Sequence, residues 1–249
     1  MKNLEPLGAT PWFPFPHKIA LDGHDWSAEE IVTALTPFLK DERRKRLDAV
    51  AAARTFGVAT VVDGLYDRGN VSAVMRSAEG LGFAPFHVVE TQARFKKANR
   101  VTQGSDKWLE ITRWKDPALC AKHLKALGYQ IVTTHLEAAK PIDAIDFTRP
   151  TALVLGNEKN GVSQQMLDHT DHNIIIPMSG FAQSFNISVA AAISLYHIRL
   201  NRDRAGMASD LTPEQLVALR AQYYLRSVGN ARAILARLAD DPNKVDGVA

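Results

Sequence analysis

The chain has 249 residues, of which 46% are hydrophobic and 23% are charged, as is ordinary for a globular protein with one substantial core. Its formal net charge is only +3. A lone cysteine, Cys120, excludes an internal disulfide framework and favours a reducing compartment. The N-terminal sequence lacks the apolar core of a secretory signal, and no stretch approaches the roughly eighteen apolar residues of a membrane span. We therefore expect a cytoplasmic protein that does not enter a membrane.

The N-terminal part of the chain predicts an arm followed by helices. Residues 1–26 combine prolines with aromatic side chains, which predicts an extended arm whose aromatics dock on the protein body. A capping-box pattern at Ser27 starts a short helix. Pro37 fits the first position of a second helix, which is expected to reach about Ala53.

From Gly57 onward, short apolar runs alternate with helical patterns. The expected strands span 58–62, 86–89, 130–134, 152–155 and 174–176, with a further candidate at 108–114. The expected helices span 70–81, 117–127, 161–169 and 184–200. This alternation predicts an α/β fold with a mostly parallel sheet and helices on both faces.

The C-terminal part predicts a second helical segment. Another capping-box pattern at Thr212 starts a helix that is expected to reach about Ala239 and that carries several arginines. We therefore divide the chain into an N-terminal arm and helical extension (1–54), an α/β core (55–205) and a C-terminal helical tail (206–249).

Two polar loops in the core indicate a ligand site. One lies in the segment Thr151-Ala-Leu-Val-Leu-Gly-Asn-Glu-Lys-Asn-Gly-Val-Ser163, and the other lies between Ile174 and Ser188. In both, a short apolar strand runs into a loop rich in glycine and short polar residues, and the loop then opens a helix. Such loops lie at the carboxyl ends of parallel strands, where ligands bind. Two in succession predict a crevice for a polar small molecule.

Several polar residues of these loops have both a structural and a functional interpretation. The helix expected at 184–200 is apolar on nearly all sides, which predicts that it is buried. Ser184 and Asn186 lie in its first turn, where short polar side chains either cap the helix or bind a ligand. The glycine-containing loop before them favours binding for the pair. Glu158 follows a strand, and its carboxylate either binds a ligand or caps the helix that begins near Gly161.

Arg76 lies in an otherwise small and apolar helix, six residues after Asn70. An isolated arginine in such a setting usually pairs with a carboxylate. The alternative is an anionic ligand, because the guanidinium is expected near the carboxyl end of the preceding strand. The segment from Asp168 to His172 resembles a metal cluster only weakly, so no metal site is expected.

Basic residues gather in three places. They are Arg43 to Arg46 with Arg54, the segment from Arg94 to Arg100 with Lys107, and the C-terminal arginines. A single run of charge is usually a solvated face. Three such groups on a chain with a polar crevice favour a phosphate-rich partner. Folded RNA is favoured over duplex DNA, because no groove-reading module is present.

At these residues the chain resembles the SPOUT class of RNA methyltransferases, in its SpoU/TrmH branch of ribose 2'-O-methyltransferases. Three signature blocks of the branch are recognisable in order and spacing: Asn70 to Arg76, Leu153 to Ser163, and Ile174 to Ala191. The similarity runs through about 55–205. The Glu158-Lys159 pair, the helical arm and the arginine-bearing tail most resemble the tRNA guanosine-18 enzymes of the branch.

The resemblance implies a SPOUT fold with a C-terminal trefoil knot over about 151–200, S-adenosylmethionine bound in the knot, and a homodimer with residues of both chains near the reaction centre. The implied cofactor contacts, largely through backbone groups, are Thr134, Gly156, Ile176 and Phe185. The implied catalytic set is Asn70, Arg76, Glu158, Ser184 and Asn186. Gly69 replaces a common histidine, which leaves fine substrate contacts open, and Phe185 replaces a common leucine.

The implied activity is S-adenosylmethionine-dependent 2'-O-methylation of a ribose in tRNA, with guanosine 18 of the D-loop as the expected target. The alternatives are methylation of ribosomal RNA and a non-catalytic RNA-binding protein that kept the fold. A nucleotide-dependent enzyme is disfavoured because neither phosphate-binding glycine fingerprint is present. Since a guanidinium resists deprotonation, the hypothesis for Arg76 is that it binds the adjacent phosphate and stabilises a developing alkoxide.

Overall fold

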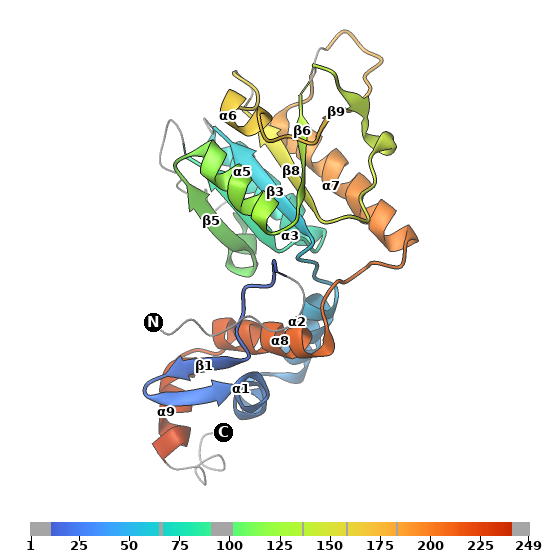
Figure 1. Cartoon of the computed structure of the whole chain (residues 1–249). Helices are drawn as coiled ribbons and strands as arrows, with labels where there is room; N and C mark the ends of the chain where they lie inside the picture. Colours follow the sequence, from blue (N-terminus) through green and yellow to red (C-terminus); the bar gives the residue numbers. More distant parts are fainter. Residues whose placement is uncertain are drawn as a thin grey trace. The chain divides into compact units, whose positions relative to one another are not determined.

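The structure, a computed structural model, describes residues 11–64, 67–90, 102–135, 137–157, 159–182 and 184–240. Contacts divide the chain into two compact units, one made of residues 55–210 and one made of residues 1–54 together with 211–249 (Figure 1). None of the helices in the described ranges has the length and apolar character needed to span a bilayer.

The larger unit is built on a seven-stranded sheet with the order β5-β4-β3-β8-β6-β9-β7. Its strands are β3 (Val58–Asp63), β4 (Pro85–Val89), β5 (Glu110–Trp114), β6 (Gln130–Thr134), β7 (Lys140–Pro141), β8 (Thr151–Gly156) and β9 (His172–Ile175). Each neighbouring pair in this order is parallel. The predicted parallel sheet is therefore confirmed, including the candidate strand at 108–114, whereas the two-residue strand β7 was not predicted.

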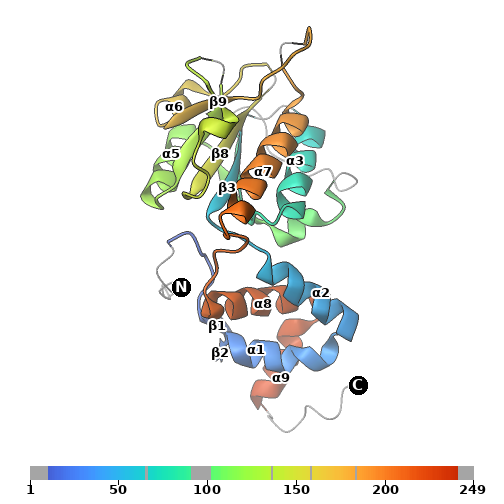
Figure 2. The same cartoon turned by 90° about the vertical axis from the view of Figure 1, so that its right-hand side faces the viewer.

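Helices cover both faces of this sheet. They are α3 (Arg68–Gly80), α5 (Pro117–Ala126), α6 (Gln164–Leu167) and α7 (Ile187–Arg204), with the 3₁₀ turns η2 (Ser105–Trp108) and η3 (Ile142–Ala144). Helices α5 and α6 lie on one face, and α3 packs beside α7 on the other (Figure 2). The central strands β3 and β4 are buried at every position, because apolar side chains point to both faces and meet helices on each side.

The helix expected at 161–169 is much shorter than predicted. It is the single turn α6, which begins only at Gln164. The preceding residues form a closed loop in which Asn157 N donates to Gly161 O at 3.1 Å and Gly161 N donates to Asn157 O at 2.9 Å. Because Gly161 adopts a left-handed conformation with φ 68°, the α-helix does not start there.

The smaller unit contains a β-hairpin and helices from both ends of the chain. Its elements are β1 (Lys18–Leu21), β2 (His24–Ser27), α1 (Ala28–Leu35), η1 (Thr36–Phe38), α2 (Asp41–Ala52), α8 (Pro213–Ser227) and α9 (Ala231–Asp240). The predicted capping boxes at Ser27 and Thr212 are both confirmed. Phe13 and Phe15 are buried, so the predicted docking of the arm's aromatics is confirmed, whereas the hairpin was not predicted. Residues 1–10 of the arm lie outside the described residues.

Two predicted helices of this unit are interrupted. The helix expected to run from Pro37 to about Ala53 is a 3₁₀ turn followed by α2, because Lys40 between them is extended (φ −61°, ψ 143°). The tail helix expected to reach Ala239 divides into α8 and α9. The break follows from Asn230, whose φ of 55° is left-handed and does not continue an α-helix.

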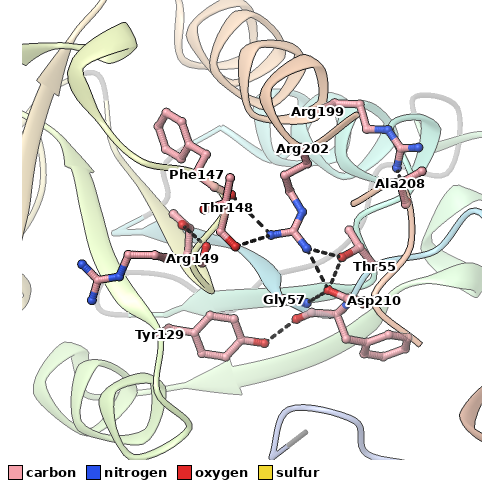
Figure 3. Close-up of polar contacts among 12 residues, drawn as sticks. Thr55, Gly57, Tyr129, Phe147, Thr148, Arg149, Arg199, Arg202, Ala208 and Asp210 are labelled. Carbon is pink, nitrogen blue, oxygen red and sulfur yellow. Dashed lines mark hydrogen bonds and ion pairs between the residues drawn. The ribbon is translucent and has the colours of Figure 1, made fainter. Parts of the chain in front are cut away.

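A buried ion pair joins the end of α7 to the amino-terminal edge of the sheet (Figure 3). Arg202 Nη2 lies 3.2 Å from Asp210 Oδ2, and the Asp210 carboxylate also accepts hydrogen bonds from Phe56 N at 2.8 Å and Gly57 N at 2.6 Å. The Arg202 guanidinium also donates to Phe147 O at 3.3 Å, just before β8. Burial lowers the pKa of Arg202, and the neighbouring Asp210 carboxylate opposes this shift. The pair therefore fixes the start of β3 and the segment after α7 to each other.

Candidate active site

The carboxyl ends of three adjacent strands form the edge at which the candidate site lies. Strand β6 ends at Thr134 and pairs with both β8, which ends at Gly156, and β9, which ends one residue before Ile176. Three of the residues expected to contact the cofactor, Thr134, Gly156 and Ile176, therefore lie at the ends of neighbouring strands at the carboxyl edge of the sheet. The predicted location of the two polar loops, at the carboxyl ends of parallel strands, is confirmed.

Gly156 lies against the loop that follows it. A Cβ atom added there would lie 2.2 Å from Gly161 C and 2.2 Å from Val162 N, so no side chain fits. The loop reaches this position because Asn157 and Gly161 close it with the two backbone hydrogen bonds given above. Glycine at 156 therefore allows the chain to fold back over the end of β8.

The side chain of Asn157 organises the same loop. Its Oδ1 accepts hydrogen bonds from Lys159 N at 2.9 Å and from Asn160 N at 2.6 Å, and its Nδ2 donates to Gly64 O at 2.6 Å. The loop after β8 is thereby fastened to the chain directly after β3. No role was predicted for Asn157 from the sequence, although an asparagine directly after a strand and before a glycine-containing loop is a turn signal. Glu158 itself lies outside the described residues, and its role stays a prediction.

Asn70 and Asn186 come together although 116 residues separate them in the sequence. Asn186 Nδ2 donates to Asn70 Oδ1 at 3.3 Å. Asn70 lies in the first turn of α3, and Asn186 is the N-cap of α7, where its Oδ1 accepts from Ser188 N at 2.9 Å. The two amides thus lie at the amino ends of two packed helices, where unpaired N–H groups and the helix dipoles favour negative charge.

Ser184 and Phe185 precede α7, and both are exposed. Sequence reasoning placed Ser184 in the first turn of the helix, with capping as its structural alternative. That alternative is wrong, because α7 begins at Ile187 and its cap is Asn186. Ser184 therefore lies in the loop before the helix, two residues before Asn186.

Arg76 is exposed on α3. At 3.6 residues per turn, the six residues from Asn70 rotate the helix by about 240°, so the two side chains leave α3 in different directions. The structural interpretation of Arg76 required a carboxylate partner, and within the described residues it has no ion pair or hydrogen bond. Within the described part of the chain, no hydrogen bond joins Arg76 to Asn70 or Asn186.

The prediction that the helix at 184–200 is buried is wrong for one side of α7. Val189 is 44% exposed, Ile193 is 37% exposed and Tyr196 is 55% exposed, and Phe185 just before the helix is 37% exposed. These four residues, called the α7 stripe below, recur at the spacing of one helix face. Apolar periodicity predicts that a face is covered, but it does not tell whether the same chain or another molecule covers it.

The segment from Asp168 to His172, which resembles a metal cluster only weakly, has a structural role. Asp171 accepts a hydrogen bond from Ile131 N at 2.6 Å and forms an ion pair with Lys125. These contacts hold the turn before β9 against β6. In the parts of the chain that the structure describes, no group of three or more His, Cys, Asp or Glu residues is arranged to hold a metal ion.

A parallel α/β sheet with polar loops at the carboxyl ends of its strands, and with an amide pair at two helix N-termini, is typical of proteins that bind a polar ligand at that edge. Comparison with known families identifies the branch. The model of the SpoU rRNA Methylase family matches residues 57–196, which is more than half of the chain and includes all nine predicted site residues. The chain belongs to this family.

Individual relatives agree with this assignment. A tRNA (guanosine(18)-2'-O)-methyltransferase of Borreliella burgdorferi is 31% identical over 204 residues, covering 82% of this chain and 94% of that protein. The crystal structure of a TrmH/SpoU tRNA-modifying enzyme of A. aeolicus is similar with a TM-score of 0.70 and 32% identity, covering 76% of this chain and 98% of that one. The SpoU methyltransferase AviRb of Streptomyces viridochromogenes, solved with its cofactor AdoMet, is similar with a TM-score of 0.54 and 28% identity over 59% of this chain and 60% of that one.

Proposed function

We propose that the protein transfers a methyl group from S-adenosylmethionine to the 2'-hydroxyl of a ribose in tRNA, with guanosine 18 of the D-loop as its target. The family match carries this proposal, because it includes every residue of the expected catalytic and cofactor sets. The choice of tRNA is supported by the Borreliella burgdorferi relative, which is a guanosine-18 enzyme, and by the A. aeolicus tRNA-modifying enzyme.

The strand-end edge fits S-adenosylmethionine as a cofactor. Thr134, Gly156 and Ile176 place strand-end backbone on three neighbouring strands, and such ends offer N–H and C=O groups to the polar parts of a ligand. Gly156 has no side chain that would cover this backbone. Phe185 is exposed in the loop before α7 and would contribute its backbone. When bound, the cofactor would supply a methyl group that is already activated for attack, because it is attached to a positively charged sulfur.

The chain's own residues then orient the ribose and stabilise charge. The amides of Asn70 and Asn186 both donate and accept hydrogen bonds, so this pair is suited to hold the ribose hydroxyl. The guanidinium of Arg76 carries a positive charge and presents parallel N–H donors, which suit the binding of an oxyanion. It is therefore proposed to bind the phosphate next to the reacting ribose and to stabilise negative charge on the 2'-oxygen. Glu158 and Ser184 complete the proposed set by their family positions.

Three further features belong to this proposal. The first is a trefoil knot over about 151–200, which is supported by a strand order that places β6 between β8 and β9. The second is a division into a core at 55–205 with helical extensions at 1–54 and 206–249. The third is a cytoplasmic location, which agrees with an RNA substrate and a single buried cysteine, Cys120.

We also propose a homodimer in which the α7 stripe is covered by a second copy of the chain. Replacing Ile193, in the middle of the stripe, by aspartate is expected to convert a dimer into a monomer, because a buried unpaired charge is costly. The molar mass measured by light scattering should then fall from twice the chain mass to the chain mass of 27.4 kDa. The matched control is Leu119→Asp on α5, where the side chain is 56% exposed and the mass should not change. A monomeric wild-type chain would contradict the dimer.

Methyl transfer from labelled S-adenosylmethionine tests the proposed activity. Unmodified tRNA transcripts and ribosomal RNA are each incubated with the protein, and the modified ribose is mapped. The expected result is label in tRNA at the 2'-oxygen of guanosine 18, and no label in a transcript with 2'-deoxyguanosine at this position. Label in ribosomal RNA alone would support the runner-up substrate, which the family's description as rRNA methylases favours. Binding of tRNA without transfer to either RNA would identify a non-catalytic RNA-binding protein.

A further inference from the structure

Both ends of the loop at 157–163 are bonded to two consecutive residues at the end of β3. At the beginning of the loop, Asn157 Nδ2 donates to Gly64 O at 2.6 Å. At its end, Ser163 N donates to Asp63 Oδ2 at 2.8 Å. Asn157 is only 6% exposed and Asp63 is fully buried, so water does not compete for these bonds. The two links connect the loop of the second signature block to the chain that leads into the first block.

The orientation of the Asn157 amide is fixed by its neighbours. Two N–H groups, those of Lys159 and Asn160, face its oxygen, and a carbonyl group, that of Gly64, faces its nitrogen. A flipped amide would bring donors against donors and an acceptor against an acceptor. Aspartate supplies only acceptors, and a serine hydroxyl carries its donor and its acceptors on one atom, so neither reaches the N–H groups and the Gly64 carbonyl from two separate atoms as the amide does.

The Gly64 carbonyl is itself held in place. Gly64 has a left-handed φ of 71°, and its N–H donates to Val89 O at 3.2 Å. Six residues further along the chain is Asn70, which contacts Asn186. On the other side of the link, Asn157 is followed directly by Glu158 and preceded by Gly156. The link from Asn157 to Gly64 therefore lies between the expected cofactor edge and the expected substrate residues.

Asp63 provides the second link at a cost in stability. Its Oδ1 is buried without a hydrogen-bond partner among the described residues, and a half-satisfied buried carboxylate is unfavourable. Its Oδ2 nevertheless holds the loop end through Ser163 N. This combination is typical of a residue retained for the geometry that it imposes rather than for stability.

We propose that Asn157, assisted by Asp63, is a positioning residue that sets the distance between the cofactor loop and the residues that bind the ribose. This inference rests on the proposed function and assigns a role to two residues outside its catalytic set. A change in the link displaces the loop at 157–163 relative to Asn70. Because methyl transfer needs an aligned donor and acceptor, a displacement of about 1 Å is enough to lower the rate by about a hundredfold.

The isosteric variant Asn157→Asp tests the link. It keeps an oxygen for Lys159 N and Asn160 N but places a second oxygen against Gly64 O. We expect kcat to fall about a hundredfold, as for a misaligned donor, and the Kd for S-adenosylmethionine, measured by calorimetry without RNA, to rise about tenfold. Hydrogen exchange should show faster exchange of the amides at 159–163 and little change elsewhere. Asp63→Asn keeps an oxygen for Ser163 N, and its effects should be smaller on every measurement.

Asp210→Asn is the matched control for a general loss of stability. It weakens the buried pair with Arg202 at the amino-terminal edge of the sheet, away from the loop at 157–163. It should lower the unfolding midpoint but leave the cofactor Kd and the loop exchange unchanged. The proposal is overturned if the amides at 159–163 exchange as slowly in Asn157→Asp as in the wild-type chain. It is also overturned if kcat falls equally in Asn157→Asp and Asp210→Asn when the two are compared at the same folded fraction.

Failure of the proposed function would be seen separately. If the wild-type chain does not bind S-adenosylmethionine, the assignment of the cofactor is wrong. The exchange comparison still decides whether Asn157 holds the loop, because it needs neither cofactor nor RNA.

Discussion

Replacing Arg76 by lysine is expected to lower kcat for tRNA methylation by on the order of 10²–10³-fold, while tRNA binding is largely retained. Lysine keeps the positive charge, but it is a point charge and does not present two parallel N–H groups to a phosphate. In the proposed reaction the guanidinium contacts the phosphate and the developing charge on the 2'-oxygen together. Single-turnover transfer from labelled S-adenosylmethionine measures the rate, and filter binding measures the affinity for tRNA.

Arg149→Lys is the control for this experiment. Arg149 is exposed, and it lies just before β8 at the amino-terminal edge of the sheet, where its side chain points away from the buried pair (Figure 3). This variant should match the wild-type chain in rate and affinity. Equal turnover of Arg76→Lys and the wild-type chain would refute the proposed role. A loss of tRNA affinity as large as the loss of rate would make Arg76 a binding residue only.

In the proposed homodimer, the direction of the Arg76 side chain leads to an expectation about the chain in which it acts. It is exposed and leaves α3 in a different direction from Asn70, so in the proposed homodimer it is expected to reach the site of the partner chain. Mixed dimers of Arg76→Ala and Asn186→Ala chains test this directly. If the arginine acts across the interface, one of the two sites in each mixed dimer is intact and activity partly returns. If it acts within its own chain, both sites are defective and no activity returns.

The larger unit was largely predictable because its strands carry a strong signal. Apolar, β-branched runs such as 58–62 and 152–155 are buried on both faces, which is typical of the central strands of a parallel sheet covered by helices. Short elements carry no such signal. Strand β7 has two residues, and α6 is one turn whose start is set by the loop at 157–163, which depends on contacts with Asp63 and Gly64 that are distant in sequence.

Local turn chemistry was underestimated in the C-terminal tail. The helix predicted from the capping box at Thr212 was extended to about Ala239 through Gly229 and Asn230. This glycine-asparagine pair is itself a turn signal, and Asn230 adopts a left-handed conformation with φ 55°. The break was therefore predictable from these two turn residues.

The candidate site was predictable as a set of loops but not as a set of contacts. Sequence order placed Asn70 and Asn186 in two separate blocks, and only the packing of α3 on α7 brings the two amides within 3.3 Å. The role of Asn157 depends on a carbonyl group 93 residues earlier in the chain. Glycine, asparagine and serine in a loop indicate where a site lies, whereas their hydrogen-bond partners follow from the tertiary fold.

Replacing Arg202 by methionine is expected to lower the free energy of unfolding by about 3–5 kcal/mol, because it leaves the Asp210 carboxylate without its buried cation. The Arg202 side chain is 2% exposed and that of Asp210 is 11% exposed, so solvent compensates little. Urea denaturation measures the loss, and Arg113→Met is the control. The Arg113 side chain is 57% exposed and 3.7 Å from Glu90, so its loss should cost less than about 1 kcal/mol. The double variant Arg202→Met with Asp210→Asn should recover part of the loss, because the uncompensated charge is removed. A double variant no more stable than Arg202→Met would contradict the uncompensated Asp210 charge as the main source of the loss, and the bonds of Arg202 to the Phe147 carbonyl and of Asp210 to Phe56 N and Gly57 N would then account for it.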